Sequence, residues 1–257
     1  MVLFSCFVGF YISGKKLDYQ VLFLLLSVLL HSFGNSILNQ YQEVASDSLM
    51  NRTRKRPIVT GKISKKTALK LSFMFLSISF FIPLILERYL VVVILFLNLL
   101  TYNFIYTPLK KVTPLALLIG SISGALPPIV GWFFVKDGFE FSIIFIATTF
   151  YLWQVPHFLY LSEIYREEYE NAGFKILIST VSRYKYRLIK GLWLLAYLLF
   201  LYYSLFLGIT KSSILMYASV SILSVVLFMD LSGNILKSRL KFNILNLSIL
   251  LFVISIF

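Results

Sequence analysis

Three polar side chains that follow the apolar run 19–38 have the spacing of one helix face. Asn39, Glu43 and Asp47 are each four residues apart, which places them one helical turn after another on the same side. Oxygen ligands at this spacing suit a hard cation such as Mg²⁺, which binds one or two carboxylates together with phosphate oxygens of a substrate. The spacing therefore predicts a metal–phosphate site, and three residues that cap a helix end are the alternative.

A dense cationic segment comes directly after these residues. It reads Arg52-Thr-Arg-Lys-Arg-Pro57, and its guanidinium groups are suited to neutralise a diphosphate. Carboxylates and arginines beside an apolar interior are what a polyprenyl diphosphate needs, because metal and cations hold its head while the interior holds its tail. The alternative is that the basic run only sets the membrane topology.

A second acidic loop repeats this combination further along the chain. It runs from Tyr165 to Gly173 and contains Arg166, Glu167, Glu168 and Glu170, with the glycine placed to end a helix. A solvated helix end of mixed charge is the alternative. Two such loops in one chain favour a shared anion site.

The composition indicates what must position these residues. The chain has 257 residues, of which 59% are apolar and 14% charged, and its mean hydropathy is +0.85. Soluble domains carry about 25% charged residues, so we expect a polytopic membrane protein. The single cysteine, Cys6, excludes a disulfide scaffold and is expected to be a core side chain.

Eight apolar runs have about the 20 residues that a membrane-spanning helix needs. They are residues 19–38, 67–86, 89–106, 114–134, 140–160, 187–208, 211–230 and 240–257. The run 2–13 is too short to span, and we expect it to be the last part of a first helix whose beginning is missing or short. The predicted fold is an all-α membrane bundle of about nine helices around a central apolar cavity, with residues 1–257 as one domain.

The basic residues are segregated between the two sides of the predicted bundle. Of 24 lysines and arginines, 19 lie in or beside the loops 39–66, 107–113, 161–186 and 231–239. Basic loops stay on the cytoplasmic side, so we expect an inner (cytoplasmic) membrane protein whose two acidic loops face the cytoplasm. This topology accounts for the basic charge, and nothing in the sequence suggests a nucleic-acid partner.

Four segments together carry a resemblance to a known family. They are Asn39-Gln-Tyr-Gln-Glu43-Val-Ala-Ser-Asp47-Ser-Leu-Met50-Asn-Arg52-Thr53, then Tyr106-Thr-Pro-Leu-Lys-Lys111, then Gly124-Ala-Leu-Pro127-Pro128-Ile-Val-Gly131-Trp132, and Trp153-Gln-Val-Pro-His157-Phe158. With Arg166-Glu-Glu168-Tyr169, they resemble the membrane prenyltransferase superfamily (UbiA-like) and, within it, the protohaem IX farnesyltransferase (haem O synthase) family. Two positions depart from the family pattern, because Glu43 and Glu168 stand where aspartate is usual.

The resemblance implies the substrates and the roles of individual residues. It implies transfer of a farnesyl group from farnesyl diphosphate to a vinyl group of haem B, with Mg²⁺ as the cofactor and the lipid bilayer as the surroundings. The metal ligands and catalytic residues that it implies are Asn39, Glu43, Asp47 and Glu168. The substrate-binding residues that it implies are Arg52, Arg56, Lys110, Arg166, Tyr106, Trp153 and His157.

Several alternatives stay open at this point. His157 is either a haem contact or a histidine that serves packing near a helix end, and Glu167 is the substitute if Glu168 is not the ligand. A sister enzyme that prenylates a quinone or chlorophyll precursor would share most of these motifs. An organic-anion transporter is the rival from another class, although transporters usually place their polar residues in the middle of the bilayer.

Overall fold

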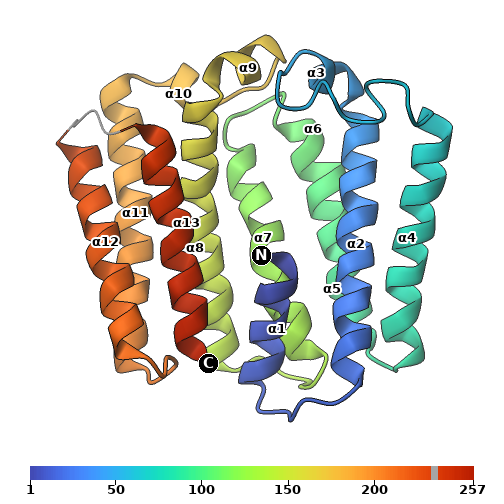
Figure 1. The fold of residues 1–257 in the computed structure, drawn as a ribbon, viewed down its shortest axis with the longest axis vertical. Coiled ribbons are helices and arrows are strands. Elements are labelled where there is room, and N and C mark those ends of the chain that lie inside the picture. Colours follow the sequence, from blue (N-terminus) through green and yellow to red (C-terminus); the bar gives the residue numbers. More distant parts are fainter. Residues whose placement is uncertain (233–236) are drawn as a thin grey trace. The chain divides into compact units, whose positions relative to one another are not determined.

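The computed structural model describes residues 1–232 and 237–257, and within these ranges its regular elements are all helices. In chain order they are α1 (Val2–Ile12), α2 (Gln20–Gln42), α3 (Val44–Ser48), α4 (Lys65–Ile85), α5 (Tyr89–Leu99), the π-helix η1 (Leu100–Tyr106), α6 (Thr107–Leu109), α7 (Ala116–Phe133), α8 (Phe141–Ile164), α9 (Arg166–Asn171), α10 (Leu177–Thr180), α11 (Arg183–Phe206), α12 (Ser213–Leu231) and α13 (Ser238–Ile256) (Figure 1). The all-α prediction is confirmed.

Eight helical stretches in the described residues are long and apolar enough to cross a membrane. They are α2, α4, the continuous stretch Tyr89–Leu109, α7, α8, α11, α12 and α13, and each coincides with one predicted run. The shorter α1 corresponds to the run 2–13. Three of the helices begin at serine N-caps, where Ser64, Ser182 and Ser212 accept a hydrogen bond from a backbone N–H three residues later.

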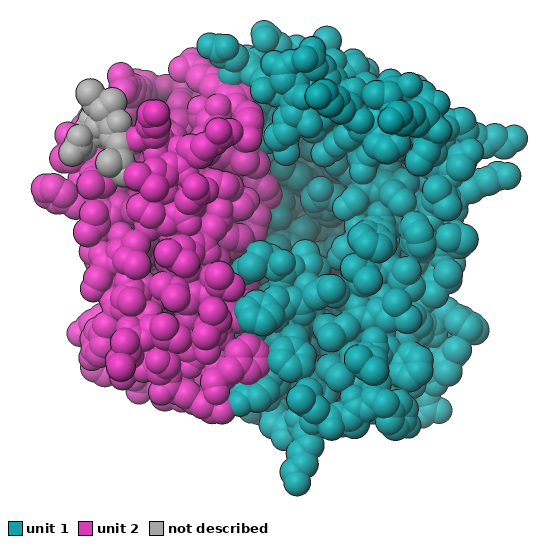
Figure 2. All heavy atoms as spheres, in the orientation of Figure 1, with its two compact units in different colours: residues 1–144, 167–175 teal, residues 145–166, 176–257 magenta. Residues whose placement is uncertain are grey.

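The chain forms two compact units, which are coloured separately in Figure 2. Unit 1 contains residues 1–144 and 167–175, and unit 2 contains residues 145–166 and 176–257. The organisation as one domain and the central apolar cavity stay predictions.

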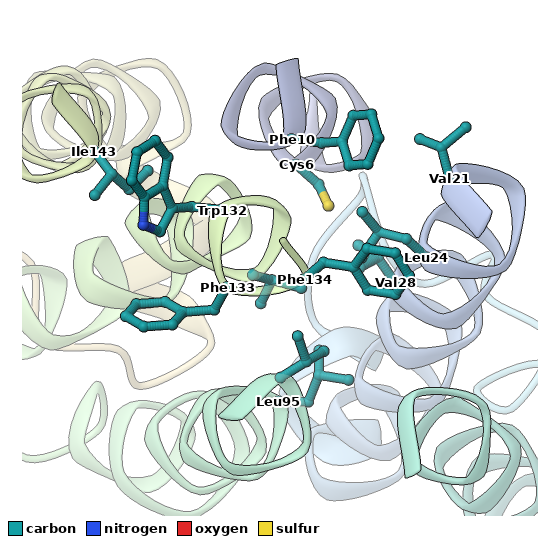
Figure 3. Close-up of a cluster of buried hydrophobic side chains, with 12 residues drawn as sticks. Cys6, Phe10, Val21, Leu24, Val28, Leu95, Trp132, Phe133, Phe134 and Ile143 are labelled. Carbon is teal, nitrogen blue, oxygen red and sulfur yellow. The ribbon is translucent and has the colours of Figure 1, made fainter. Parts of the chain in front are cut away.

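Close approach of α1 to α7 organises the core of unit 1. A Cβ atom added to Gly131 would lie 1.9 Å from the carbonyl oxygen of Cys6, and one added to Gly9 would lie 1.8 Å from that of Pro128. Glycines at such contacts let two membrane helices approach backbone to backbone. Figure 3 shows the apolar cluster beside this contact, in which Cys6 from α1 packs with Leu24 from α2 and residues of α7. The expected core position of Cys6 is confirmed by its burial.

A buried network of charges joins the four long helices of unit 2. Lys190 on α11 donates to Glu163 on α8 at 2.6 Å, and its Nζ lies 3.4 Å from Asp230 on α12. Asp230 also accepts hydrogen bonds from Lys241 on α13, at 2.6 Å, and from the hydroxyl of Tyr160 on α8. The side chains of Lys190 and Asp230 are each only 3% exposed, so each charge depends on its partners for compensation. The network fixes these four helices to one another.

Candidate functional site

The first acidic segment lies at the end of α2 and in the short helix α3. At Glu43 the backbone leaves helical geometry, with φ −109° and ψ 12°, so α2 ends there and α3 begins. The backbone bonds from Glu43 to Asn39 (3.0 Å) and from Asp47 to Glu43 (2.8 Å) keep the four-residue spacing across this break. Asn39, Glu43 and Asp47 are 7%, 4% and 1% exposed, so the polar row is turned into unit 1.

Each buried carboxylate of this row has a cationic partner. Lys110, directly after α6, donates to Glu43 at 2.7 Å. Arg56, in the basic segment that follows α3, donates to Asp47 at 2.6 Å. Burying a carboxylate without a partner would cost several kcal/mol, and these two pairs offset that cost. Two of the substrate-binding residues that the resemblance implies are therefore in direct contact with two of the implied metal ligands.

One oxygen of each carboxylate remains without a hydrogen bond. Within the described residues, Oδ1 of Asp47 and Oε1 of Glu43 are buried and make none. Oε1 of Glu43 nevertheless lies 2.7 Å from Lys110 Nζ, so its charge is compensated by that ion pair. A buried acceptor without a donor is costly. Oδ1 of Asp47 is therefore a buried carboxylate oxygen of this row that accepts no hydrogen bond, while Arg56 pairs with Oδ2 of the same carboxylate.

Asn39 is held by the segment around the π-helix. Its amide Nδ2 donates to Oγ1 of Thr107 at 3.0 Å, and the Thr107 hydroxyl donates to the carbonyl of Tyr102 at 2.8 Å. Gln42, at the end of α2, donates to the carbonyl of Asn103 at 3.0 Å. Insertions that form π-helical turns are frequent at functional sites. Sequence reasoning missed Thr107 as a partner, although it lies inside the segment 106–111 that carried the resemblance.

Within unit 1, the second acidic segment contacts the basic segment that follows α3, and the chain after α9 contacts Lys110. Oε2 of Glu168 accepts a hydrogen bond from the backbone N–H of Arg52 at 3.2 Å, and the Arg52 guanidinium donates to the hydroxyl of Tyr169 at 3.4 Å. The backbone N–H of Lys175 donates to the carbonyl of Lys110 at 2.9 Å. In Figure 1, α3, α6 and the part of α9 that belongs to unit 1 accordingly lie at the same end of that unit. Glu168 is thus next to the basic segment, and its role as a metal ligand stays a prediction.

A small apolar cluster supports this contact. Met50, which follows α3, packs with Ala172, Phe174 and Tyr169 from the second segment. Gly173 has a φ of +79°, a conformation that glycine adopts without strain, and it turns the chain after α9 so that Phe174 can reach the cluster. The glycine that the sequence marked as a helix end therefore also places the second segment.

Lys110 and Tyr106 form an aromatic and cationic wall of the site. Lys110 Nζ lies 5.0 Å from the ring centre of Tyr106 and 5.2 Å from that of Phe174. Burial lowers the pKa of Lys110 below its ordinary 10.5, and the neighbouring Glu43 carboxylate opposes this shift. The Tyr106 ring packs against Gly120 of α7, where an added Cβ would lie only 2.8 Å from it.

Three further predicted site residues, Trp153, His157 and Arg166, belong to unit 2. Trp153 and His157 lie on α8, where Trp153 donates to the carbonyl of Leu245 at 3.2 Å and His157 contacts Asn246 at 2.9 Å. Arg166 is exposed at the start of α9 and also belongs to unit 2. Their participation in the site stays a prediction.

The other glutamates of the second loop have different surroundings. Glu163 belongs to the charge network of unit 2, with Lys190 and Ser238 as its partners. Glu167 and Glu170 are exposed. Among the described residues, no three His, Cys, Asp or Glu side chains are close enough together to hold a metal ion by themselves.

The described residues thus form a polytopic helical membrane protein whose unit 1 carries buried carboxylates paired with cations near helix ends. The model of the UbiA prenyltransferase family matches residues 2–247, and the chain belongs to this family. It is a multi-pass membrane protein of this family.

Two curated relatives and two solved structures illustrate the similarity. Protoheme IX farnesyltransferase of Cytophaga hutchinsonii is 38% identical over 153 residues, which are 59% of this chain and 53% of that protein. The enzyme of the same name from Ehrlichia canis is 33% identical over 200 residues, which are 72% and 68% of the two chains. The chain thus spans about half the length of the Cytophaga relative.

The apo structure of a UbiA homolog from Aeropyrum pernix K1 has a TM-score of 0.78 at 16% identity and covers 100% of this chain and 97% of that one. A UbiA homolog from Archaeoglobus fulgidus bound to GPP and Mg²⁺ has a TM-score of 0.66 at 13% identity, with 99% and 96% covered. At this identity, both structures show the shared fold.

Proposed function

We propose that this protein transfers a farnesyl group from farnesyl diphosphate to a vinyl group of haem B and so produces haem O. The observation that carries the proposal is the presence of two ion pairs with buried carboxylates, Glu43–Lys110 and Asp47–Arg56. Glu168 contacts the backbone of Arg52, in the same basic segment as Arg56. The names of the similar proteins from Cytophaga hutchinsonii and Ehrlichia canis support the choice of haem and farnesyl as substrates.

The donor set of the site fits Mg²⁺. Asn39, Glu43, Asp47 and Glu168 offer oxygen ligands, and the buried Oδ1 of Asp47, which accepts no hydrogen bond, is suited to a hard cation. A site with few carboxylates fits this ion, which completes its coordination with substrate phosphates and water. When bound, Mg²⁺ would supply Lewis-acid stabilisation of the charge on the leaving diphosphate. The Archaeoglobus homolog, whose structure contains GPP and Mg²⁺, supports this assignment.

The cations of the chain neutralise the leaving group. Arg56 and Lys110 are held by the carboxylates at the site, and Arg52 and Arg166 add charge from exposed positions. When the bond between C1 of the farnesyl group and the diphosphate oxygen breaks, these groups stabilise the charge that develops on that oxygen. The allylic carbon then bonds to the haem vinyl group, and water adds to the resulting cation as a hydroxyl with loss of a proton. Tyr106, Trp153 and His157 remain proposed substrate contacts, because the resemblance to the family implies this role for each of them.

The reaction belongs at the cytoplasmic side of the inner membrane. The concentration of basic residues in the loops 39–66 and 161–186 supports this orientation. Cysteine labelling tests it: in right-side-out vesicles an Asn51→Cys variant should escape an impermeant reagent, and a C-terminal tag should be accessible. Labelling of position 51 from outside would contradict the orientation.

A single assay tests the function. Membranes that contain the protein are incubated with haem B, farnesyl diphosphate and Mg²⁺, and the extracted pigments are analysed by mass spectrometry. Haem O is expected with the unmodified chain and not with an Asp47→Asn variant. Prenylation of a quinone or chlorophyll precursor in parallel incubations, without any product from haem B, would replace this function by that of a sister enzyme.

A further inference from the structure

The helices α8 and α13 of unit 2 contact each other through two adjacent polar bonds. On α8, Trp153 and His157 are one turn apart, and on α13 their partners Leu245 and Asn246 are consecutive. The indole N–H donates to the Leu245 carbonyl at 3.2 Å, and Nδ1 of His157 lies 2.9 Å from Oδ1 of Asn246. Contacts with α13 therefore fix the position of the His157 ring.

Aromatic rings on two sides restrict the same imidazole. Its centroid is 4.8 Å from that of Trp153 and 4.8 Å from that of Phe242, with interplanar angles of 49° and 46°. A ring packed in this way does not turn freely, so the nitrogen that faces Asn246 stays Nδ1. The hydrogen bond to Asn246 then determines which nitrogen carries the proton.

An amide oxygen only accepts hydrogen bonds, so a neutral imidazole that faces it must carry its proton on Nδ1. The other nitrogen, Nε2, then has a lone pair directed away from α13. We infer that Asn246 is a positioning residue that holds His157 in the Nδ1–H tautomer, so that Nε2 offers its lone pair to the iron of the haem substrate. Histidines that bind a metal through one nitrogen usually donate the other N–H to an oxygen in this way. The inference rests on the proposed function for the identity of the ligand.

The tautomer can be measured without substrate. The chain has only two histidines, so in a His31→Gln background His157 is the sole imidazole. Long-range ¹H–¹⁵N correlation spectra of the ¹⁵N-histidine-labelled protein in detergent should show a protonated Nδ1 and an unprotonated Nε2 at neutral pH. Asn246→Asp keeps the accepting oxygen and should keep this tautomer, whereas Asn246→Leu should shift the population towards Nε2–H. Asn243→Leu, an exposed position one turn earlier on α13, is the matched control.

Haem binding supplies the second measurement. Titration of the same variants with haem B, followed by the absorption spectrum, should show a histidine-ligated iron in the unmodified protein, in Asn246→Asp and in Asn243→Leu. Asn246→Leu should bind haem about 10-fold more weakly, and His157→Ala should lose the ligated spectrum.

The possible results test the role of Asn246, the assignment to the haem iron and the proposed function separately. If Asn246→Leu keeps the tautomer and the haem affinity of the unmodified protein, or if Asn246→Asp is as damaging as Asn246→Leu, the role of Asn246 is refuted. If the tautomer is as expected but the spectrum shows no histidine ligation, the assignment to iron is refuted. If the unmodified protein ligates haem through His157 but forms no haem O, the proposed function fails while the inference about Asn246 stands.

Discussion

Asp47 and Arg56 form an ion pair, 2.6 Å from Oδ2 to Nη1, in which the carboxylate side chain is 1% exposed and the guanidinium side chain 31%. The carboxylate therefore fixes the arginine from inside the protein while the arginine remains accessible from solvent. Lys110 and Glu43 repeat this arrangement, with side chains 18% and 6% exposed. In the proposed reaction, the diphosphate would approach Arg56 and Lys110 from the side on which each is exposed.

Replacing Asp47 by asparagine should abolish turnover while the protein still folds. The change removes the negative charge that pairs with Arg56, and it also removes a proposed carboxylate ligand of the metal. The size of the side chain is kept. We expect haem O formation to fall about 100-fold or more, as measured by mass spectrometry of extracted pigments. Asp137→Asn, an exposed acid outside the site, is the control. Near-normal activity of a folded Asp47→Asn variant would show that the polar row only caps the helix.

Glu168→Gln should lower turnover more than Glu167→Gln or Glu170→Gln. Glu168 accepts the backbone N–H of Arg52, whereas its two neighbours are exposed. We expect a loss of about 10-fold or more in kcat/KM for farnesyl diphosphate, with only small changes for the two control variants. If Glu167→Gln gave the larger loss, Glu167 would be the ligand of the second segment instead.

The activity should decline at alkaline pH because Lys110 loses its proton earlier than an ordinary lysine. Burial lowers the pKa of Lys110, so its charged form, which would stabilise the leaving diphosphate, is lost at a pH below 10.5. An arginine stays charged throughout this range.

Profiles of kcat/KM against pH should therefore fall at a lower pH for the unmodified protein than for Lys110→Arg. The exposed neighbour provides the control, because Lys111→Arg should leave the profile unchanged. Stability depends on pH in the opposite direction to activity. Because the pKa of Lys110 is lower in the folded protein than in the unfolded chain, the unfolded chain binds more protons at pH values between these two pKa values. The contribution of Lys110 to the free energy of unfolding therefore rises with pH there.

Gly131→Ala should destabilise the protein by about 1–3 kcal/mol. The added Cβ would lie 1.9 Å from the Cys6 carbonyl oxygen, so α1 would have to move away from α7. Thermal unfolding in detergent measures the effect, and Gly138→Ala is the control because a Cβ there would meet no atom within 4 Å. Equal midpoints for the two variants would mean that α1 adapts to the methyl group without cost.

The membrane-spanning helices could be predicted from the sequence because they depend on a local property. A run of about 20 apolar residues in lipid must satisfy its backbone hydrogen bonds within itself, which leaves the helix as its conformation. For this reason all eight predicted runs coincide with helices of the structure. The four-residue spacing of Asn39, Glu43 and Asp47 is local as well, and the backbone bonds across Glu43 preserve it.

The partners of these side chains were decided by tertiary structure alone. Nothing local distinguishes Lys110 from Lys111 or Arg56 from Arg54, and only helix packing brings Lys110 to Glu43, 67 positions earlier in the chain. The same holds for Thr107 beside Asn39 and for Arg52 beside Glu168. Glu163 resembles the other loop acids in sequence, but packing of α8 against α11 pairs it with Lys190 instead. Hydropathy and periodicity determine which residues share a helix and a face of that helix. Contacts between helices depend on how well whole helix surfaces fit one another, and a short sequence segment does not contain this information.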